Sequence, residues 1–310
     1  MSTFLVTGGA GFIGSHIVER LAREGHDVRV LDSFATGKRD NVAGIAGRVG
    51  LIEGDIRDAA AVKGAVSGAE VVFHQAALGS VPRSLTDPAT TNAVNVTGTL
   101  NVLIAAKEAG VRRVIYASSS SVYGLTNEFP QREDHPTRPI SPYAVSKLAG
   151  ENYTVAFAKS FGLETVALRY FNVFGPRQDP SSVYAAVIPR FIAALREGRP
   201  LTIHGEGEQS RDFTYVENVV VANLLAAQAK GVSGAVFNIA CGGSVSVNTL
   251  ARSLCEIVGK EFKADYAPPR AGDLRRSCAD ISKARQALGY VPGISFEEGL
   301  KRTVRFFMGK

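Results

Sequence analysis

The chain has 310 residues, of which 45% are hydrophobic and 21% charged, a balance typical of a globular protein with a sizeable core. Its formal net charge of +6 is spread along the sequence without a nucleic-acid-binding motif, so a phosphorylated small molecule is a better expected partner than DNA or RNA. The longest apolar run, 219–227, is too short to span a bilayer, and we expect neither a signal peptide nor a membrane partner. Three scattered cysteines without a C-x-x-C pair argue against disulfides or a zinc site, and we expect a cytoplasmic protein without a metal.

The first motif is a glycine-rich loop between a strand and a helix. An apolar run at 4–6 predicts a buried strand, and apolar residues at helical spacing within 17–21 predict the helix. Gly8, Gly11 and Gly14 lie between them and let the backbone approach a pyrophosphate at the helix N-terminus. The next strand ends in Asp32, whose carboxylate can accept hydrogen bonds from ribose hydroxyls and would repel a 2′-phosphate. This order predicts NAD rather than NADP.

Strands and helices then alternate. Further strands are predicted at 51–52, 71–74, 114–117 and 165–168, with helices starting near Asp58, covering 89–109 and starting at Pro142. Gln75, Ala76 and Ala77 follow the fourth strand, where small residues are expected if a cofactor lies across the sheet edge. The pattern predicts a Rossmann-type, doubly wound parallel sheet over residues 1–175.

The remainder of the chain, 176–310, is less regular. Helices are predicted at 188–196, at 247–258 and from 296 onward, with a strand at 201–204, a strand that ends at 238–240 and a helix that follows 210–216. No linker or repeat separates this part from the first. We therefore expect a smaller α/β substrate-binding lobe interwoven with the sheet.

Tyr143 and Lys147 are the candidate catalytic pair. They stand four residues apart in a segment that Pro142 is well placed to start as a helix, so the two side chains share a face. An ammonium beside a phenol stabilises the phenolate, and we expect Lys147 to lower the pKa of Tyr143 and make it a general base. Upstream, the serines at 118–121 end a central strand, where a hydroxyl can hydrogen-bond a sugar oxygen.

Together these motifs resemble the extended short-chain dehydrogenase/reductases. The spacing G-x-x-G-x-x-G, Tyr143-x-x-x-Lys147 and the position of Ser119 match that family's glycine loop and its Ser-Tyr-Lys constellation. The block 169–177 (RYFNVFGPR) and the segments 74–84 and 178–189 resemble the sugar-nucleotide enzymes of the family. Along essentially its whole length, the chain is similar to NAD-dependent sugar epimerases and dehydratases, in particular to UDP-sugar 4-epimerases.

This resemblance implies NAD as a tightly held cofactor, because each epimerisation cycle regenerates it. The residues expected to contact it are Gly8, Gly11, Phe12, Ile13, Gly14, Asp32, Thr36, Gly37, Asp55, Ile56, Gln75, Ala76, Ala77, Asn95, Tyr143, Lys147, Tyr170 and Val173.

A UDP-sugar is the implied substrate. Arg211 and Arg270 match diphosphate contacts of the family, and Ser277 occupies a position that borders the sugar pocket, where a bulky tyrosine excludes an N-acetyl group. Serine there predicts that N-acetylated sugars are accepted. The residues expected to contact the substrate are Arg83, Ser119, Ser120, Ser121, Asn172, Ala186, Val187, Thr202, His204, Arg211, Arg270, Asp273 and Ser277.

The implied reaction is 4-epimerisation of UDP-glucose and UDP-galactose, and of their N-acetylated counterparts, through a 4-keto sugar. Tyr143 takes the proton of the 4-hydroxyl, Lys147 holds the nicotinamide ribose and Ser119 holds the sugar oxygen. Two alternatives stay open: a UDP-glucuronate 4-epimerase or decarboxylase, with Arg83 or Arg177 as partner of the sugar carboxylate, and a non-catalytic NAD-binding regulatory protein. The resemblance also implies a homodimer packed through 89–109 and 143–161.

Overall fold

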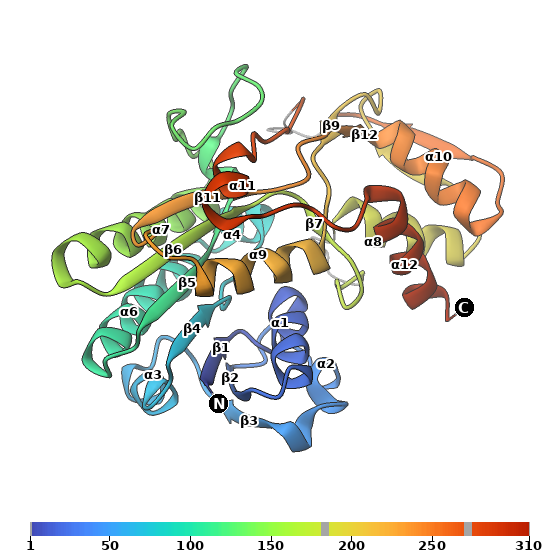
Figure 1. The fold of residues 1–310 in the computed structure, drawn as a ribbon. Coiled ribbons are helices and arrows are strands. Elements are labelled where there is room, and N and C mark those ends of the chain that lie inside the picture. Colours follow the sequence, from blue (N-terminus) through green and yellow to red (C-terminus); the bar gives the residue numbers. More distant parts are fainter. Residues whose placement is uncertain (1, 181–185, 270–274, 310) are drawn as a thin grey trace.

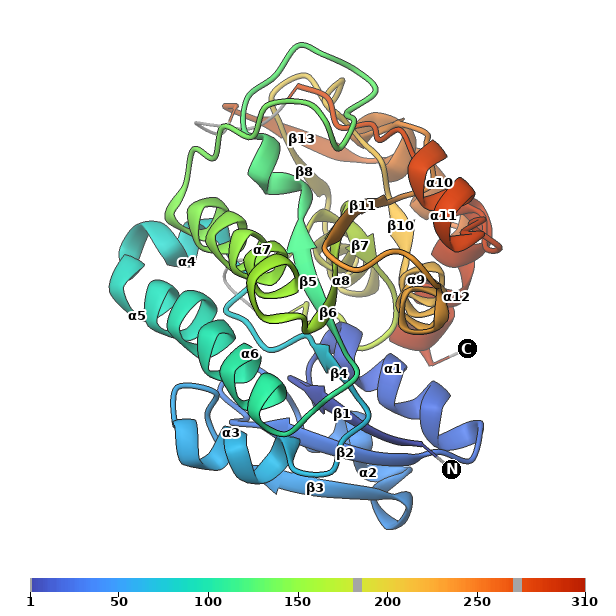
Figure 2. The same cartoon turned by 60° about the vertical axis from the view of Figure 1, so that its left-hand side comes forward.

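The computed structural model describes residues 2–180, 186–269 and 275–309. A larger lobe holds a parallel sheet between two layers of helices, and a smaller lobe with α8, α10 and α12 lies beside it (Figures 1 and 2). No helix of these described ranges is long and apolar enough to cross a membrane. The expected contacts Arg270 and Asp273 lie outside the described residues.

The central sheet has seven strands in the order β11-β6-β5-β4-β1-β2-β3, and every neighbouring pair is parallel. Because the chain order reverses between β1 and β4, the connections at the carboxyl ends of these strands diverge and leave a crevice for a ligand. The strands are β1 (Thr3–Thr7), β2 (Asp27–Asp32), β3 (Val49–Glu53), β4 (Val71–His74), β5 (Arg113–Ser119), β6 (Glu164–Tyr170) and β11 (Ala235–Ile239).

Both faces of this sheet are covered, which explains why its strands are nearly continuous apolar runs. Successive side chains point to opposite faces: Val6 and Phe73 join the core under α1 and α9, whereas Leu5 and Val72 join the core under α3 and α6. The helical elements of this lobe are α1 (Phe12–Arg23), α2 (Asp40–Ala43), η1 (Ala46–Arg48), α3 (Ala59–Val66), α4 (Val81–Thr86), α5 (Pro88–Asn92), η2 (Ala93–Thr97), α6 (Gly98–Glu108), η3 (Ser120–Tyr123), α7 (Pro142–Phe161), α9 (Val216–Gln228) and α11 (Ser282–Leu288). The predicted doubly wound α/β fold is confirmed.

The helix predicted over 89–109 differs in detail. It consists of α5 and α6 joined by η2, a π-helical segment, and the short α4 before it was not predicted. At the π segment the Thr99 hydroxyl donates to the Asn95 carbonyl oxygen at 2.6 Å, which replaces part of the regular backbone bonding. π segments of this kind occur frequently at functional sites.

The smaller lobe has its own core, in which Phe191, Leu250 and Leu300 bring α8, α10 and α12 together. Between these helices run short strand pairs, including β8 with β13. The chain returns from this lobe to the sheet through α9 and β11, so the two lobes are interwoven, and a division near residue 175 stays a prediction. The elements are β7 (Val173–Phe174), α8 (Val187–Arg196), β8 (Leu201–His204), β9 (Ser210–Arg211), β10 (Thr214–Tyr215), β12 (Val245–Ser246), α10 (Val247–Val258), β13 (Ala264–Ala267) and α12 (Phe296–Met308).

Candidate active site

Ser119, Tyr143 and Lys147 meet where the carboxyl end of β5 faces the start of α7. The helix begins here because the Ser141 side chain accepts a hydrogen bond from the Ala144 amide at 3.2 Å, with proline at the first helical position. Tyr143 then hydrogen-bonds with the Ser119 side chain, one turn before Lys147. The structure therefore brings the three predicted catalytic side chains to one place.

The electrostatics of this pair differ from the prediction. Burial raises the pKa of Tyr143, and the hydrogen bond with Ser119 opposes that rise. Burial also lowers the pKa of Lys147 to about 7, and its Nζ donates to the Ala117 carbonyl oxygen at 2.8 Å. The predicted lowering of the Tyr143 pKa by Lys147 is therefore wrong for the chain alone, because burial penalises the charged form of both groups. Burial in this environment therefore favours the neutral phenol and the neutral amine over their charged forms.

The glycine loop forms the floor of the neighbouring crevice. Gly8 has φ +67°, and a Cβ atom there would lie 2.7 Å from the backbone nitrogen of Ala76. A Cβ atom on Gly14 would lie 2.2 Å from the Gly8 carbonyl oxygen. Glycine is required at both positions, and Gly11 caps the N-terminus of α1, where Phe12 and Ile13 start the helix. The loop therefore presents backbone and a helix N-terminus to the crevice, which suits a pyrophosphate.

Asp32 lies at the end of β2 with 7% of its surface exposed. Its two carboxylate oxygens accept from the amides of Ala10, at 2.9 Å, and Phe34, at 2.8 Å. A Cβ atom on Gly37, beside Thr36, would come 2.7 Å from Oδ1, so the loop closes tightly over the carboxylate. The two basic side chains that follow in the sequence form ion pairs away from Asp32: Lys38 with Asp179, and Arg39 with Glu53. These residues fit a ribose with free hydroxyls, as in NAD, better than a 2′-phosphate.

Asn95 connects the cofactor crevice to the catalytic helix. Its Oδ1 accepts from the Leu78 amide at 2.8 Å, and its Nδ2 donates to the Ser146 hydroxyl at 2.9 Å. Ser146 in turn donates to the Tyr143 carbonyl oxygen at 2.8 Å. This chain of contacts ties the loop after β4, which starts at Gln75, Ala76 and Ala77, to the turn of α7 that carries the phenol.

Some predicted cofactor residues have other partners. The Asp55 carboxylate is held by the Arg57 guanidinium, which lowers the Asp55 pKa, and Ile56 is buried beneath α6. The Tyr170 hydroxyl shares hydrogen bonds with Gln75 and with Asn223 on α9. Tyr170 therefore positions Gln75 at the sheet edge, and the side chains of Asp55 and Ile56 serve local structure.

A cavity of about 260 Å³ lies in the smaller lobe next to this crevice. Seven of the predicted contacts line it: Asn172, Val173, Ala186, Val187, Thr202, His204 and Arg211. Further lining residues were not predicted, among them Arg190, Phe213 and Gln178. Arg190 stands three residues after Val187 on α8, so helical spacing from the predicted residue could have indicated it. Two arginines and several apolar side chains make the cavity suited to an anionic group attached to a flat, apolar one.

Three more of the predicted substrate residues, Ser277, Ser120 and Ser121, lie next to a cavity residue or to Ser119. The Ser277 hydroxyl is buried and accepts from Asn172 Nδ2 at 3.2 Å, so it borders the cavity lining. Ser120 and Ser121 form η3 directly after Ser119, and the Ser121 Oγ is buried without a hydrogen-bond partner among the described residues. Arg83 is half-buried on α4.

Most of the chain matches the model of one protein family. Residues 4–240 match the model of the NAD dependent epimerase/dehydratase family. The chain belongs to this family. Relatives of the epimerase/dehydratase chain include the UDP-glucose 4-epimerase of Mycolicibacterium smegmatis, 41% identical over 99% of this chain and 98% of the relative.

Solved structures of this family agree along the whole chain. A UDP-N-acetylglucosamine 4-epimerase of Methanobrevibacter ruminantium, in complex with UDP-N-acetylmuramic acid, is 40% identical with a TM-score of 0.95, covering 99% of this chain and 98% of its own. The Thermus thermophilus UDP-glucose 4-epimerase, solved with NAD, is 39% identical with a TM-score of 0.90, covering 99% of both chains. This protein is thus an enzyme of an NAD-dependent epimerase family, and the predicted cofactor is confirmed.

Proposed function

We propose that the enzyme is a UDP-sugar 4-epimerase that interconverts UDP-glucose with UDP-galactose and UDP-N-acetylglucosamine with UDP-N-acetylgalactosamine. The observation that carries this proposal is the meeting of Ser119, Tyr143 and Lys147 between the glycine loop and the arginine-lined cavity. A phenol with a hydroxyl beside it can exchange a proton with a sugar hydroxyl. Ser119 is the register partner of Tyr170, and Asn172, two residues further along the chain, lines the cavity that would hold the nucleotide end.

Tyr143, Ser119 and Lys147 have different roles in the proposed reaction. A bound NAD, which the glycine loop and Asp32 would hold, would supply the hydride acceptor and donor for carbon 4 of the sugar. Tyr143 holds and returns the proton of the 4-hydroxyl, and Ser119 hydrogen-bonds the same oxygen to fix its position. Lys147, whose pKa burial lowers to about 7, is the residue expected to hold the ribose of the bound cofactor beside the phenol. The sugar becomes a 4-keto intermediate that turns over while its nucleotide stays anchored.

The cavity supports the choice of a nucleoside diphosphate anchor. Arg190 and Arg211 lie on its wall, and arginine forks suit phosphate oxygens. Phe191 and Phe213 supply apolar surface for a base. Arg270 and Asp273 stay proposed contacts that the described residues do not include.

Ser277 supports acceptance of N-acetylated sugars. It carries one of the smallest side chains and accepts a hydrogen bond from Asn172, which lines the cavity, so at this position the chain adds little volume. The UDP-glucuronate alternative keeps two candidate partners for a sugar carboxylate, Arg83 and Arg177. Arg177 Nη2 is paired with Glu19 at 2.6 Å, whereas its Nη1 is buried without a hydrogen-bond partner among the described residues.

The test uses purified protein without added NAD, incubated with UDP-N-acetylglucosamine, UDP-glucose and UDP-glucuronate in separate reactions, with the 4-epimers separated by chromatography. Conversion of the first two without a cofactor supplement is expected. Conversion of UDP-glucuronate alone, or of no UDP-sugar after NAD is added, would overturn the proposal.

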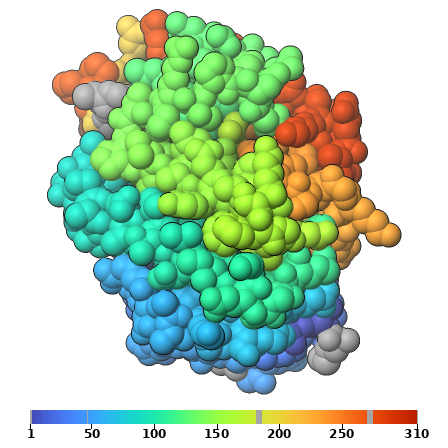
Figure 3. Space-filling view, turned by 90° about the vertical axis from the view of Figure 1, so that its left-hand side faces the viewer, coloured from blue at the N-terminus to red at the C-terminus, as the bar shows by residue number. Residues whose placement is uncertain are grey.

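We also infer that the enzyme works as a homodimer. Figure 3 shows the side of the molecule on which α6 and α7 lie. Large apolar side chains of these two helices remain exposed: Ile104 at 41%, Val145 at 52%, Tyr153 at 38% and Phe161 at 54%. Two packed helices with an exposed apolar face are suited to pairing with a second copy by a twofold axis.

A further inference from the structure

Glu151 lies one turn beyond Lys147 on α7 and faces the same end of β5. Lys147 Nζ donates to the Ala117 carbonyl oxygen at 2.8 Å, and the next residue of the strand, Ser118, donates its hydroxyl to Glu151 Oε2 at 2.7 Å. The residue after that is Ser119, which contacts the catalytic phenol. Three consecutive residues of β5 therefore each form a hydrogen bond with a residue of α7, and the three α7 residues lie on successive turns of one helix face.

An arginine on the adjacent strand holds the Glu151 carboxylate from the other side. Arg169 Nη2 donates to Oε1 at 2.7 Å and Nε donates to Oε2 at 3.0 Å, a two-pronged ion pair. The side chains are only 5% and 3% exposed. Arg169 is also the register partner of Ser118 across β6 and β5, so strand pairing and the ion pair set the same alignment.

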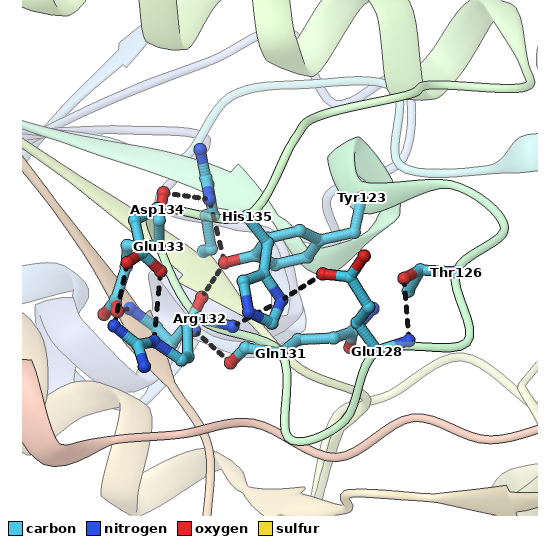
Figure 4. A network of polar contacts seen from close by, with 10 residues as sticks. Tyr123, Thr126, Glu128, Gln131, Arg132, Glu133, Asp134 and His135 are labelled. Atoms are coloured by element: carbon cyan, nitrogen blue, oxygen red, sulfur yellow. Dashed lines mark hydrogen bonds and ion pairs between the residues drawn. The ribbon is translucent and has the colours of Figure 1, made fainter.

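The Arg169 guanidinium also has a hydrogen-bond partner other than Glu151. Arg169 Nη1 donates to the Tyr123 hydroxyl at 2.8 Å, which donates to Asn238 Oδ1 on β11 at 2.7 Å. The Asn238 backbone amide donates to Glu133 Oε1 at 2.7 Å, and its side chain donates to the Gln131 carbonyl oxygen at 2.9 Å. Figure 4 shows Tyr123 together with Gln131 and Glu133 of the loop that follows it in the sequence.

We propose that Glu151 and Arg169 are positioning residues, whose ion pair sets the register of α7 against β5 and so the placement of Tyr143 and Lys147 against Ser119. Neither side chain lies in the cavity lining or at the phenol. A buried ion pair is often no more stabilising than an apolar pair of similar volume, but its hydrogen bonds impose direction. The benefit of this pair is therefore alignment, since a displacement of about 1 Å can slow catalysis by roughly 100-fold.

The test replaces the pair by apolar residues, Glu151→Leu with Arg169→Met, so that no buried charge is left alone. We expect the variant to fold with a melting temperature close to that of the wild type, because apolar replacement of both partners is often neutral. We expect kcat to fall by about 10- to 100-fold, with KM changed less than about threefold. An unchanged kcat in the folded variant would overturn the proposal.

The same strands supply a control ion pair at their other end. Arg113 on β5 and Glu164 on β6 are register partners joined at 2.7 Å, with the Arg113 side chain 4% exposed and the Glu164 side chain 44% exposed. Arg113→Met with Glu164→Leu should leave kcat unchanged even if it lowers the melting temperature. An equal loss of kcat in this control would assign the effect to sheet stability and overturn the positioning role.

This inference rests on the proposed function only for its kinetic readout. Amide hydrogen exchange can be measured in the wild type and the two double variants without substrate. We expect the amides of 142–150 to exchange faster than in the wild type in the Glu151/Arg169 variant, and at the wild-type rate in the control variant. Unchanged exchange there would overturn the inference, whatever substrate is turned over. Failure of the wild type to convert any UDP-sugar would instead overturn the proposed function, and the exchange result would still decide this one.

Discussion

Lys147 Nζ donates to the Ala117 carbonyl oxygen at 2.8 Å, in a place where only 4% of the lysine surface is exposed. The ring of Tyr116 lies 5.3 Å from the same nitrogen. One carbonyl and one ring face do not replace the hydration of an ammonium, and burial lowers the Lys147 pKa to about 7. The catalytic lysine is therefore held at a cost to stability, which is typical of functional sites.

This cost predicts a pH-dependent stability difference. Between pH 7 and 10.5 the unfolded chain binds more protons at Lys147 than the folded chain, so the wild type gains stability as pH rises through this window. Relative to Lys147→Met, the gain between pH 7 and pH 9.5 should be on the order of 3 kcal/mol. Urea unfolding of both proteins at the two pH values measures it.

Lys107→Met is the control for that comparison, since Lys107 is exposed on α6. Its stability relative to the wild type should not change between the two pH values. A Lys147→Met difference that stays constant with pH would show that the lysine is charged in the folded chain at both values.

Removal of the Tyr143 hydroxyl should stop proton transfer without unfolding the chain. We expect Tyr143→Phe to reduce kcat by about 100- to 10,000-fold, with bound NAD retained. Tyr153→Phe, on the exposed side of the same helix, is the matched control and should keep full activity. A Tyr143→Phe variant with more than a tenth of wild-type kcat would exclude the phenol as the acid–base group.

The glycine loop gives a cofactor prediction. Gly14→Ala would place a Cβ atom 2.2 Å from the Gly8 carbonyl oxygen, so the loop must move away from its position under the crevice. We expect the purified variant to lose most of its bound NAD, measured by release on denaturation and absorbance. Gly64→Ala on α3 meets nothing within 4 Å and should keep the wild-type amount. Equal NAD content in the two variants would contradict the role of the loop.

The sequence predicted the parts of the fold that local pattern determines. Apolar runs such as 71–74 become strands because both sheet faces are covered, and Ser141-Pro142 begins α7 through its own capping bond. The glycine loop and Tyr143-x-x-x-Lys147 are local motifs as well, whereas their meeting with Ser119 was implied by the family resemblance.

Other features depend on contacts between distant segments and have no local signature. Phe213 and Arg190 reach one cavity from different elements, and β8 pairs with β13 some sixty residues later. The pKa of Tyr143 depends on how deeply α7 is buried against β5, which spacing along one helix does not reveal. Likewise, the π segment around Asn95, beside which the Thr99 hydroxyl donates to the Asn95 carbonyl oxygen, has no signature in helical periodicity.

Ser277 gives a specificity prediction. Ser277→Tyr introduces a ring beside Asn172 and should abolish turnover of the two N-acetylated sugars while UDP-glucose and UDP-galactose keep most of theirs. Ser277→Ala is the control: it removes the bond to Asn172 but adds no volume, so all four sugars should still react. The kcat/KM of each sugar measures the effect, and equal loss on all four in the tyrosine variant would remove Ser277 from the sugar pocket.

The exposed apolar face of α6 and α7 gives the last prediction. If two copies pair there, light scattering of the wild type should give twice the mass of one chain, and Ile104→Glu should shift it toward the single-chain mass. A charge in an apolar interface must lose its hydration without a partner, which disfavours association. Val291→Glu adds the same charge at an apolar residue that is 60% exposed outside these helices, and it should leave the dimer intact. A dimer that survives Ile104→Glu but dissociates with Val291→Glu would place the interface beside α11 instead, because Val291 follows that helix.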